Sequence, residues 1–214
     1  MRTAPADTGK ETGQPARTAR RKSRKPGANR EAIIAAAATV FLEHGYHQAS
    51  LDDIAGRIGI SKPTIYYWVG GKEAVLAECM RQSLSGLMAR LDTIESDGLT
   101  GADQLDRAVR YCVGVACTDL GRCVVRIPDH VLSEYRNEIR GIKKAVSHIL
   151  SRLHEKGIED GTLRSGDPRL IGQLLRGLIN SVGDWFDPRG AWTPDHIADT
   201  IVVMAVDPMR VTKD

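Results

Sequence analysis

The stretch 50–73 constrains the fold most, because it predicts two short helices joined by a tight turn. Its apolar residues recur three and four positions apart, as on one face of a helix, and Ser50 precedes them as an N-cap. Gly59 can adopt the left-handed conformation that ends a helix, and Ser61 can cap a second helix two residues later. The apolar faces that would pack together are Leu51, Ile54, Ala55 and Ile58 in the first helix and Ile65 and Val69 in the second.

The second helix leaves polar and aromatic groups on the face away from this stripe. Pro63 fits its first turn, where a missing N–H costs nothing. Ser61 and the helix N-terminus can bind a phosphate, and the outward side chains can reach base edges or backbone oxygens. A plain helical hairpin, the alternative, does not account for this set. The pattern predicts a helix-turn-helix that reads duplex DNA with Lys62, Thr64, Tyr66 and Tyr67.

Residues 30–79 resemble the DNA-binding domain of TetR-family regulators. The likeness rests on an opening helix, REAIIAAAATVFLEHGYHQAS with Asn29 as its cap, then LDDIAGRIGIS, then KPTIYYWVGGKEAVL. Pro63 replaces a frequent glycine. Trp68 stands where histidine is usual, so it either donates its indole N–H to DNA or packs on the helix pair. The positions that match the family's DNA contacts are Ser50, Lys62, Pro63, Thr64, Tyr66, Tyr67, Trp68 and Lys72.

The first 29 residues have a different composition. They hold eight lysines and arginines against two acidic residues, about +6 in a chain whose net charge is +3. With few large apolar residues and no periodicity, this arm is expected to be disordered and to contact DNA. A solubilising or mis-assigned start is the alternative. The arm's predicted contacts are Arg20, Arg21, Lys22, Arg24 and Lys25.

After Gly71 the apolar spacing is helical nearly to the end, without an alternating strand pattern of useful length. Helices are expected over about 72–91, 102–118, 131–155 and 167–186, and from 193 onward. The predicted fold is all-α: a basic arm (1–29), a three-helix DNA-binding domain with the helix-turn-helix (30–74), and a larger helical ligand-binding and dimerisation domain (75–214).

The last two predicted helices carry a wider apolar arc than one packing seam needs. This excess predicts a homodimer, which would place two reading helices about 34–36 Å apart on an inverted-repeat operator. The resemblance implies the same interface, made by the last two helices of each subunit. Closure of the monomer core is the alternative. The predicted interface residues are Leu174, Leu175, Leu178, Val182, Ile197, Ile201 and Met204.

The resemblance also implies that a small apolar or amphipathic effector binds the larger domain and releases a repressor from DNA. The ending WFDPRGAWTPDHIADTI is similar to that of a TetR subset linked to fatty-acid, sterol or aromatic catabolism, some of which sense CoA thioesters. Arg122, Arg126, Arg136 or Arg140 could then meet an anionic head group. The predicted ligand contacts are Tyr111, Cys112, Val115, Arg126, Ile127, Val131 and Trp185.

Other function classes find less support in the sequence. It contains no GxSxG, HExxH, P-loop or GxGxxG motif, so we expect no enzyme, no cofactor and no metal. No apolar run approaches a membrane span, no signal peptide begins the chain, and its four cysteines show no metal spacing, so a cytoplasmic protein with reduced thiols is expected. A redox-sensing regulator and a ligand-independent architectural or adaptor protein remain as alternatives.

Overall fold

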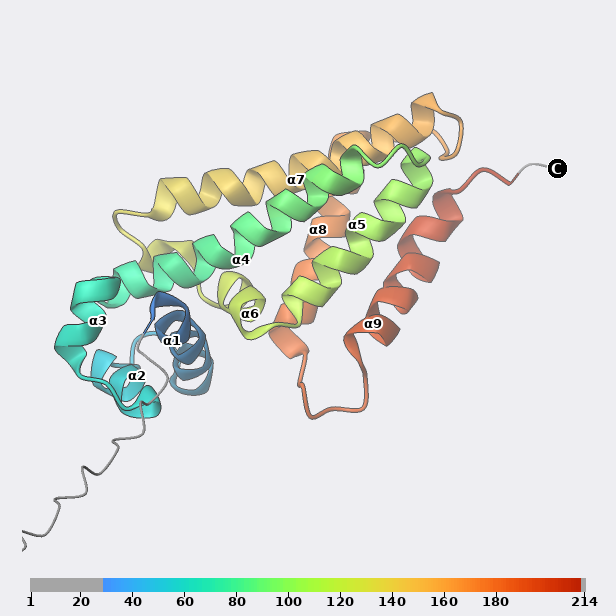
Figure 1. Cartoon of the computed structure of the whole chain (residues 1–214). Coiled ribbons are helices and arrows are strands. Elements are labelled where there is room, and N and C mark those ends of the chain that lie inside the picture. Colours follow the sequence, from blue (N-terminus) through green and yellow to red (C-terminus); the bar gives the residue numbers. More distant parts are fainter. Residues whose placement is uncertain (1–28, 213–214) are drawn as a thin grey trace, which may run out of the picture.

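The computed structural model describes residues 29–212, and within them the chain is helical (Figure 1). This confirms the predicted all-α fold. The α-helices are α1 (Arg30–His44), α2 (Leu51–Ile58), α3 (Lys62–Trp68), α4 (Lys72–Glu95), α5 (Gly101–Ala116), α6 (Asp119–Arg126), α7 (Arg136–Glu159), α8 (Pro168–Trp185) and α9 (Pro194–Ile201). A 3-10 turn, η1 (Asp129–Val131), precedes α7, while a π-helical turn, η2 (Val202–Val206), and a further 3-10 turn, η3 (Asp207–Met209), follow α9.

Helices α1 to α3 form a small unit at one end of the molecule (Figure 1). Asn29 caps α1 by accepting from the amide of Ala32 at 2.8 Å. Between α1 and α2 the Arg57 guanidinium pairs with the Glu43 carboxylate, at 2.5 and 2.8 Å. The unit's core consists of fully buried side chains, among them Ile33, Ile34, Phe41, Ile54 and Ile65. Local capping and one apolar core therefore hold α3 in place.

Helix α4 runs out of this unit and lies beside α7 along the rest of the molecule (Figure 1). It is continuous across the predicted domain boundary at 74/75. At its far end the Glu95 carboxylate pairs with the Arg152 guanidinium of α7, at 2.6 and 2.7 Å. The far half of α4 joins α5, α7, α8, α9 and η2 in enclosing the second, larger core.

Helix α6 packs on the α1–α3 unit and also on α5 and α8. Its Cys123 and Ile127 pack into the core of the α1–α3 unit, and the Thr39 hydroxyl donates to Asp119 at 3.1 Å. Against α5 it comes so close that a Cβ at Gly121 would lie 1.9 Å from the carbonyl oxygen of Val115. Only glycine allows this approach, which fixes α6 between the two parts of the fold.

The predicted helix over 131–155 is wrong at its start, because α7 begins at Arg136. Leu132 has an extended backbone, and its side chain is fully buried in the core of the α1–α3 unit. The amides of Ser133 and Glu134 donate to the distant Glu73 carboxylate. Burial and this long-range carboxylate therefore override the local helical periodicity.

Candidate nucleic-acid interface and effector cavity

The turn before α3 is built as the sequence predicts, with one exception. Ser50 and Asp53 cap each other's backbone amides at 3.1 and 2.9 Å, and Gly59 is left-handed with φ +68°. Ser61 occupies the N-cap position, but its hydroxyl bonds the Thr64 hydroxyl at 2.8 Å and does not cap a backbone amide. Both hydroxyls therefore belong to the exposed part of α3.

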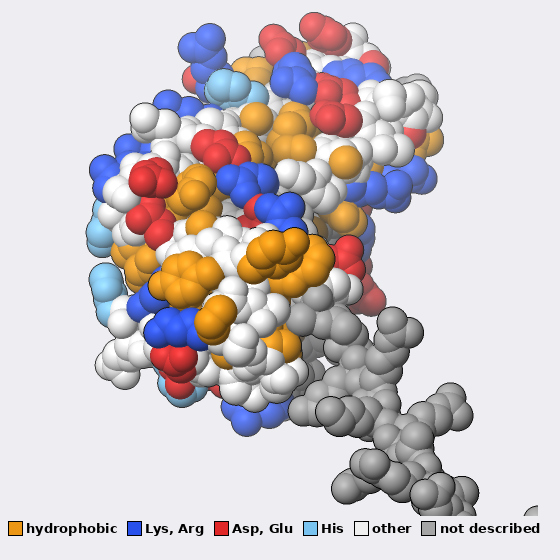
Figure 2. All heavy atoms as spheres, turned by 60° about the vertical axis from the view of Figure 1, so that its left-hand side comes forward, with side chains coloured by type: hydrophobic (Ala, Val, Ile, Leu, Met, Phe, Trp, Pro, Cys, Tyr) orange, Lys and Arg blue, Asp and Glu red, His pale blue; other side chains and the backbone are white. Residues whose placement is uncertain are grey.

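Helix α3 presents three aromatic side chains to solvent. Tyr67 is 82% exposed, Tyr66 is exposed, and Trp68 is 45% exposed with its ring edge against Tyr67 at 5.5 Å. Trp68 thus does not pack into the core of the helix pair. Figure 2, which brings the α1–α3 end forward, shows large hydrophobic side chains on the surface beside lysines and arginines. Large apolar side chains exposed to water are unfavourable in a surface without a partner. Together with nearby cations, they suit contacts with the sugars, bases and phosphates of a nucleic acid.

The two lysines of this surface are held by neighbours. The Lys62 ammonium lies 2.9 Å from the Asp52 carboxylate of α2, and that hydrogen bond raises the pKa of Lys62. The Lys72 ammonium donates to the His47 carbonyl at 3.1 Å and lies 4.6 Å from the Tyr46 ring centre, and burial lowers its pKa. The Lys62 side chain is therefore exposed and oriented by Asp52, whereas the Lys72 side chain is half-buried. Arg20, Arg21, Lys22, Arg24 and Lys25 of the predicted arm lie outside the described residues.

A cavity of about 70 Å³ lies between α4, α5, α6, α7 and α8. Two predicted ligand contacts, Cys112 and Val115, line it. Most of its wall is apolar, and its polar lining residues are Ser83, Lys143, Arg176 and Asn180. The other wall residues are Leu84, Leu87, Ala116, Gly121, Val124, Val125, Val146, Leu150 and Ile179.

The remaining predicted ligand contacts lie elsewhere. Tyr111 is at the surface, 5.9 Å from the Arg90 guanidinium, and Trp185 is 49% exposed against Trp192. The other three, Arg126, Ile127 and Val131, line a separate hollow of about 260 Å³ between the end of α1 and the α6–η1 region.

That hollow is the larger of the two, but solvent-exposed residues such as Gly45, His47 and Pro128 border it. We consider the smaller cavity the better effector site because buried side chains form most of its wall.

Neither cation of the cavity could be predicted from the sequence. None of the four candidate arginines, Arg122, Arg126, Arg136 and Arg140, lines the cavity. Lys143 and Arg176 stand on α7 and α8, and nothing in their local sequence distinguishes them from other helical surface cations. Only the packing of α7 against α8 brings the two into the lining of one cavity.

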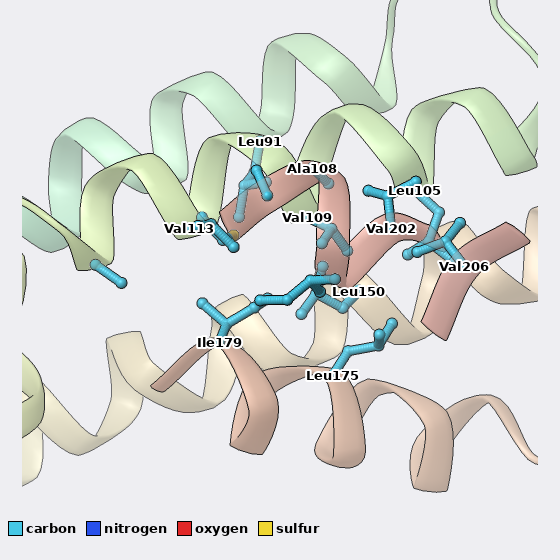
Figure 3. Packing of buried hydrophobic residues seen from close by; sticks show 14 of the residues in the cluster. Leu91, Leu105, Ala108, Val109, Val113, Leu150, Leu175, Ile179, Val202 and Val206 are labelled. Atoms are coloured by element: carbon cyan, nitrogen blue, oxygen red, sulfur yellow. The ribbon is translucent and has the colours of Figure 1, made fainter. Parts of the chain in front are cut away.

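Four predicted dimer residues are corrected by their burial within the protomer. Leu175, Val182, Ile197 and Ile201 are at most 5% exposed and belong to its larger core, so they offer no surface to a partner. Figure 3 shows Leu175 and Ile179 of α8 directed toward Leu105, Val109 and Leu150. The apolar arc of α8 is wide because the side chains on one side of it pack into the core of the protomer. The exposed apolar residues on this face are Leu170, Leu174, Val203 and Met204, with Leu178 partly buried.

The four cysteines are buried and free. Burial raises the pKa of Cys112 to about 12 and that of Cys123 to about 12, and it also raises the pKa of Cys79 and Cys117. Because the thiolate is the reactive form, a raised pKa lowers the reactivity of these thiols near neutral pH. The environment gives the redox-sensing alternative no support.

Two further findings limit the chemistry of the described residues. Between residues 29 and 212, no set of three or more metal-ligating side chains comes together. No helix in that range is both long and apolar enough to cross a bilayer.

Comparisons with known proteins agree with this architecture. A fatty acid metabolism regulator of Bacillus subtilis (strain 168) is 28% identical over 157 residues, covering 72% of this chain and 81% of that protein. The repressor KstR2 of Rhodococcus jostii (strain RHA1) is 26% identical over 189 residues, covering 83% and 89%. The solved structure of AibR in complex with isovaleryl coenzyme A and operator DNA has a TM-score of 0.72 at 22% identity, covering 83% and 97%.

Family models cover both parts of the fold. Residues 33–79, which contain the helix-turn-helix, match the bacterial regulatory proteins of the tetR family. Residues 98–209, which contain most of the larger core, match the tetracyclin repressor-like C-terminal domain. The exposed reading helix, the helical domain behind it and these matches lead to one conclusion: the chain belongs to the TetR family of bacterial transcriptional regulators.

Proposed function

We propose that this chain is a repressor that binds an inverted-repeat operator as a homodimer in the cytoplasm. It leaves the operator when a small anionic, amphipathic effector occupies the cavity between α4 and α8. The observation that carries the proposal is that α6 contributes to both sites, with Gly121, Val124 and Val125 in the cavity wall and Cys123 and Ile127 in the core of the α1–α3 unit.

The DNA contacts are assigned to α3 and its flanks. Lys62, Thr64, Tyr66 and Tyr67 would contact bases and backbone from the major groove, with Trp68 at the rim. Lys72 would contact a phosphate only after leaving the His47 carbonyl. Ser50 is half-buried and engaged by Asp53, so its role is to cap α2.

The dimer is assigned to the outer faces of α8 and η2. Leu174 and Met204 are 60% and 64% exposed, and Leu170 and Val203 lie on the same elements. Between α8 and η2–η3 lies a hollow of about 150 Å³ whose lining includes Leu174, Leu178 and Met209. A second copy related by a two-fold axis would cover these side chains and place two reading helices on one operator.

The effector is assigned from the cavity wall and the relatives. A cavity of about 70 Å³ holds about five water molecules, so a short acyl chain fits with less rearrangement than a steroid ring system. Lys143 and Arg176 would bind a carboxylate or the phosphates of a CoA thioester. Relatives named for fatty acid metabolism and for an isovaleryl coenzyme A complex support the same class.

Genomic footprinting with the full-length chain tests the proposal, because it identifies the operator and the neighbouring genes. Fluorescence anisotropy on that operator should give a Kd at least about 10³-fold below that for unrelated DNA at physiological salt. Short-chain CoA thioesters and free carboxylates are then titrated against the complex. Arg176→Met should require several-fold more of an anionic effector for half-release, relative to its own operator affinity.

The two halves of the proposal can fail separately. Equal affinity for operator and unrelated DNA would refute sequence-specific regulation. Retained operator binding across the whole panel would instead favour the ligand-independent architectural protein, since an effector must prefer the non-binding conformation to release DNA.

A further inference from the structure

The segment 129–134, which links α6 to α7, is attached to the effector cavity at its first residue. The Lys143 ammonium, part of the cavity wall, donates to the Asp129 carboxylate at 2.5 Å and to the Val124 carbonyl near the end of α6 at 2.9 Å. A second cation, Arg140, lies 3.6 Å from the other Asp129 oxygen. One ammonium thus holds both the end of α6 and the start of this segment.

At its other end the same segment is attached to the reading head, which is the α1–α3 unit with the first turn of α4. The Glu73 carboxylate, in the first turn of α4, accepts from the amides of Ser133 and Glu134 at 2.6 and 3.0 Å. The Ser133 hydroxyl donates to the same carboxylate at 2.9 and 3.0 Å. Glu73 lies five positions after Trp68, the last residue of α3, and adjoins Lys72. These hydrogen bonds from Ser133 and Glu134 to Glu73, the clamp, therefore fix the end of the turn that positions α3.

Between these attachments hydrogen bonds and one buried side chain restrain the segment. The amide of Leu132 donates to the Asp129 carbonyl at 3.1 Å, and the Arg136 guanidinium donates to the carbonyls of His130 and Leu132 at 3.0 and 3.2 Å. The Leu132 side chain is fully buried in the core of the α1–α3 unit. We therefore expect a displacement of Asp129 to move Ser133 as well, because the residues between them are restrained.

We propose that segment 129–134 transmits occupancy of the cavity to the reading head, with Lys143 as the residue that senses the effector's charge. An anionic group in the cavity draws the Lys143 ammonium from Asp129 and the Val124 carbonyl, because charge-assisted bonds to the two anions compete for one ammonium. The start of the segment then loses its closest ion pair and keeps only the longer contact with Arg140, which loosens the clamp on Glu73. This inference rests on the proposed function, since it assigns the regulation of the same cavity.

A double-mutant cycle on operator affinity tests the connection without an effector. Lys143→Met and Glu73→Gln should each weaken operator binding about 3- to 10-fold, the range expected for residues that couple two sites. The operator Kd of the double variant should lie within about twofold of the Kd of the single variant that binds less tightly, because both changes release the same segment. Independent sites would instead multiply their effects. Glu95→Gln is the matched control, because it breaks a similar pair between α4 and α7 at the far end of α4.

A second measurement does not depend on DNA. Hydrogen exchange at the amides of Ser133 and Glu134 should rise about tenfold or more in Lys143→Met and stay at the wild-type rate in Glu95→Gln. Asp129→Asn removes the same ion pair from its other side and serves if Lys143→Met does not fold. Three results would overturn the connection. They are losses of operator affinity that multiply in the double variant, stronger operator binding by either single variant, and unchanged hydrogen exchange at Ser133 and Glu134. Failure of the wild-type chain to bind any operator would refute the proposed function, while the exchange experiment would still decide this inference.

Discussion

The approach of α6 to α5 at Gly121 provides the sharpest test of the packing. In Gly121→Ala the new methyl carbon would lie 1.9 Å from the Val115 carbonyl oxygen and 2.7 Å from its carbonyl carbon. Real Cβ atoms essentially never come within 3.0 Å of such atoms, so the two helices must separate by about 1 Å. The obstructing atoms are backbone, which no side-chain rotation can move aside.

The expected cost follows from overpacking. Such strain costs about 1–3 kcal/mol, and the higher helix propensity of alanine returns up to about 1 kcal/mol of this cost. Because the obstructing atoms are backbone, we expect strain in the upper half of its range and a net loss of about 1–2 kcal/mol in the free energy of unfolding. For a chain of this length that lowers the melting temperature by about 2–8 °C.

Gly114→Ala on the neighbouring helix is the matched control. A Cβ at Gly114 meets no heavy atom within 4 Å, so the same substitution should stabilise the protein by about 0.5–1 kcal/mol. Thermal unfolding followed by far-ultraviolet circular dichroism measures both variants at one protein concentration, because a dimer's melting temperature depends on concentration. If Gly121→Ala melts at or above the wild-type temperature, the close approach of α5 and α6 is wrong.

Further predictions concern DNA and pH. Tyr67→Ala should weaken operator binding about tenfold while stability stays within about 0.5 kcal/mol, and an unchanged Kd would contradict its assigned contact. Asp52→Asn removes the carboxylate 2.9 Å from the Lys62 ammonium, so operator affinity should rise about 2- to 5-fold in low salt; a fall would show that the pair positions Lys62 for DNA. Deleting residues 1–28 should reduce the slope of log affinity against log salt by up to about 4, and an unchanged slope would remove the arm from the interface. Burial lowers the pKa of His154, so its neutral form is favoured on folding and wild-type stability should fall as pH drops below about 6.5. His154→Leu should flatten the melting temperature in that window, and an equally steep acid loss would place the titrating group elsewhere.

Local interactions explain the part of the site that the sequence predicted. The Ser50–Asp53 capping box and the left-handed Gly59 depend on residues within three positions of one another. Such contacts form wherever the chain is helical, so residue type and spacing suffice to predict them. The outward set on α3 follows likewise, because a helix with one buried residue, Ile65, must direct the others away.

Long-range packing explains what the sequence could not predict. Helical periodicity places Leu175 and Leu174 on an apolar arc, but only the neighbours of α8 decide that one closes the monomer core and the other reaches solvent. The same holds for Lys143 and Arg176, which stand on different helices and line one cavity.

The sequence by itself determined most of the helices, the caps at Asn29 and Ser50 and the identity of the reading helix, because these depend on neighbours a few residues away. It predicted no helix over 119–126, where α6 lies. The tertiary structure alone decided where α7 begins, which cations line the cavity and how Glu73 grips the segment before α7. The Glu73 carboxylate and the Ser133 amide are sixty residues apart, and their attraction exists only once both cores have formed. The spacing of apolar residues specifies which face of a helix is buried. Which element packs against that face depends on the free energy of the whole packed chain.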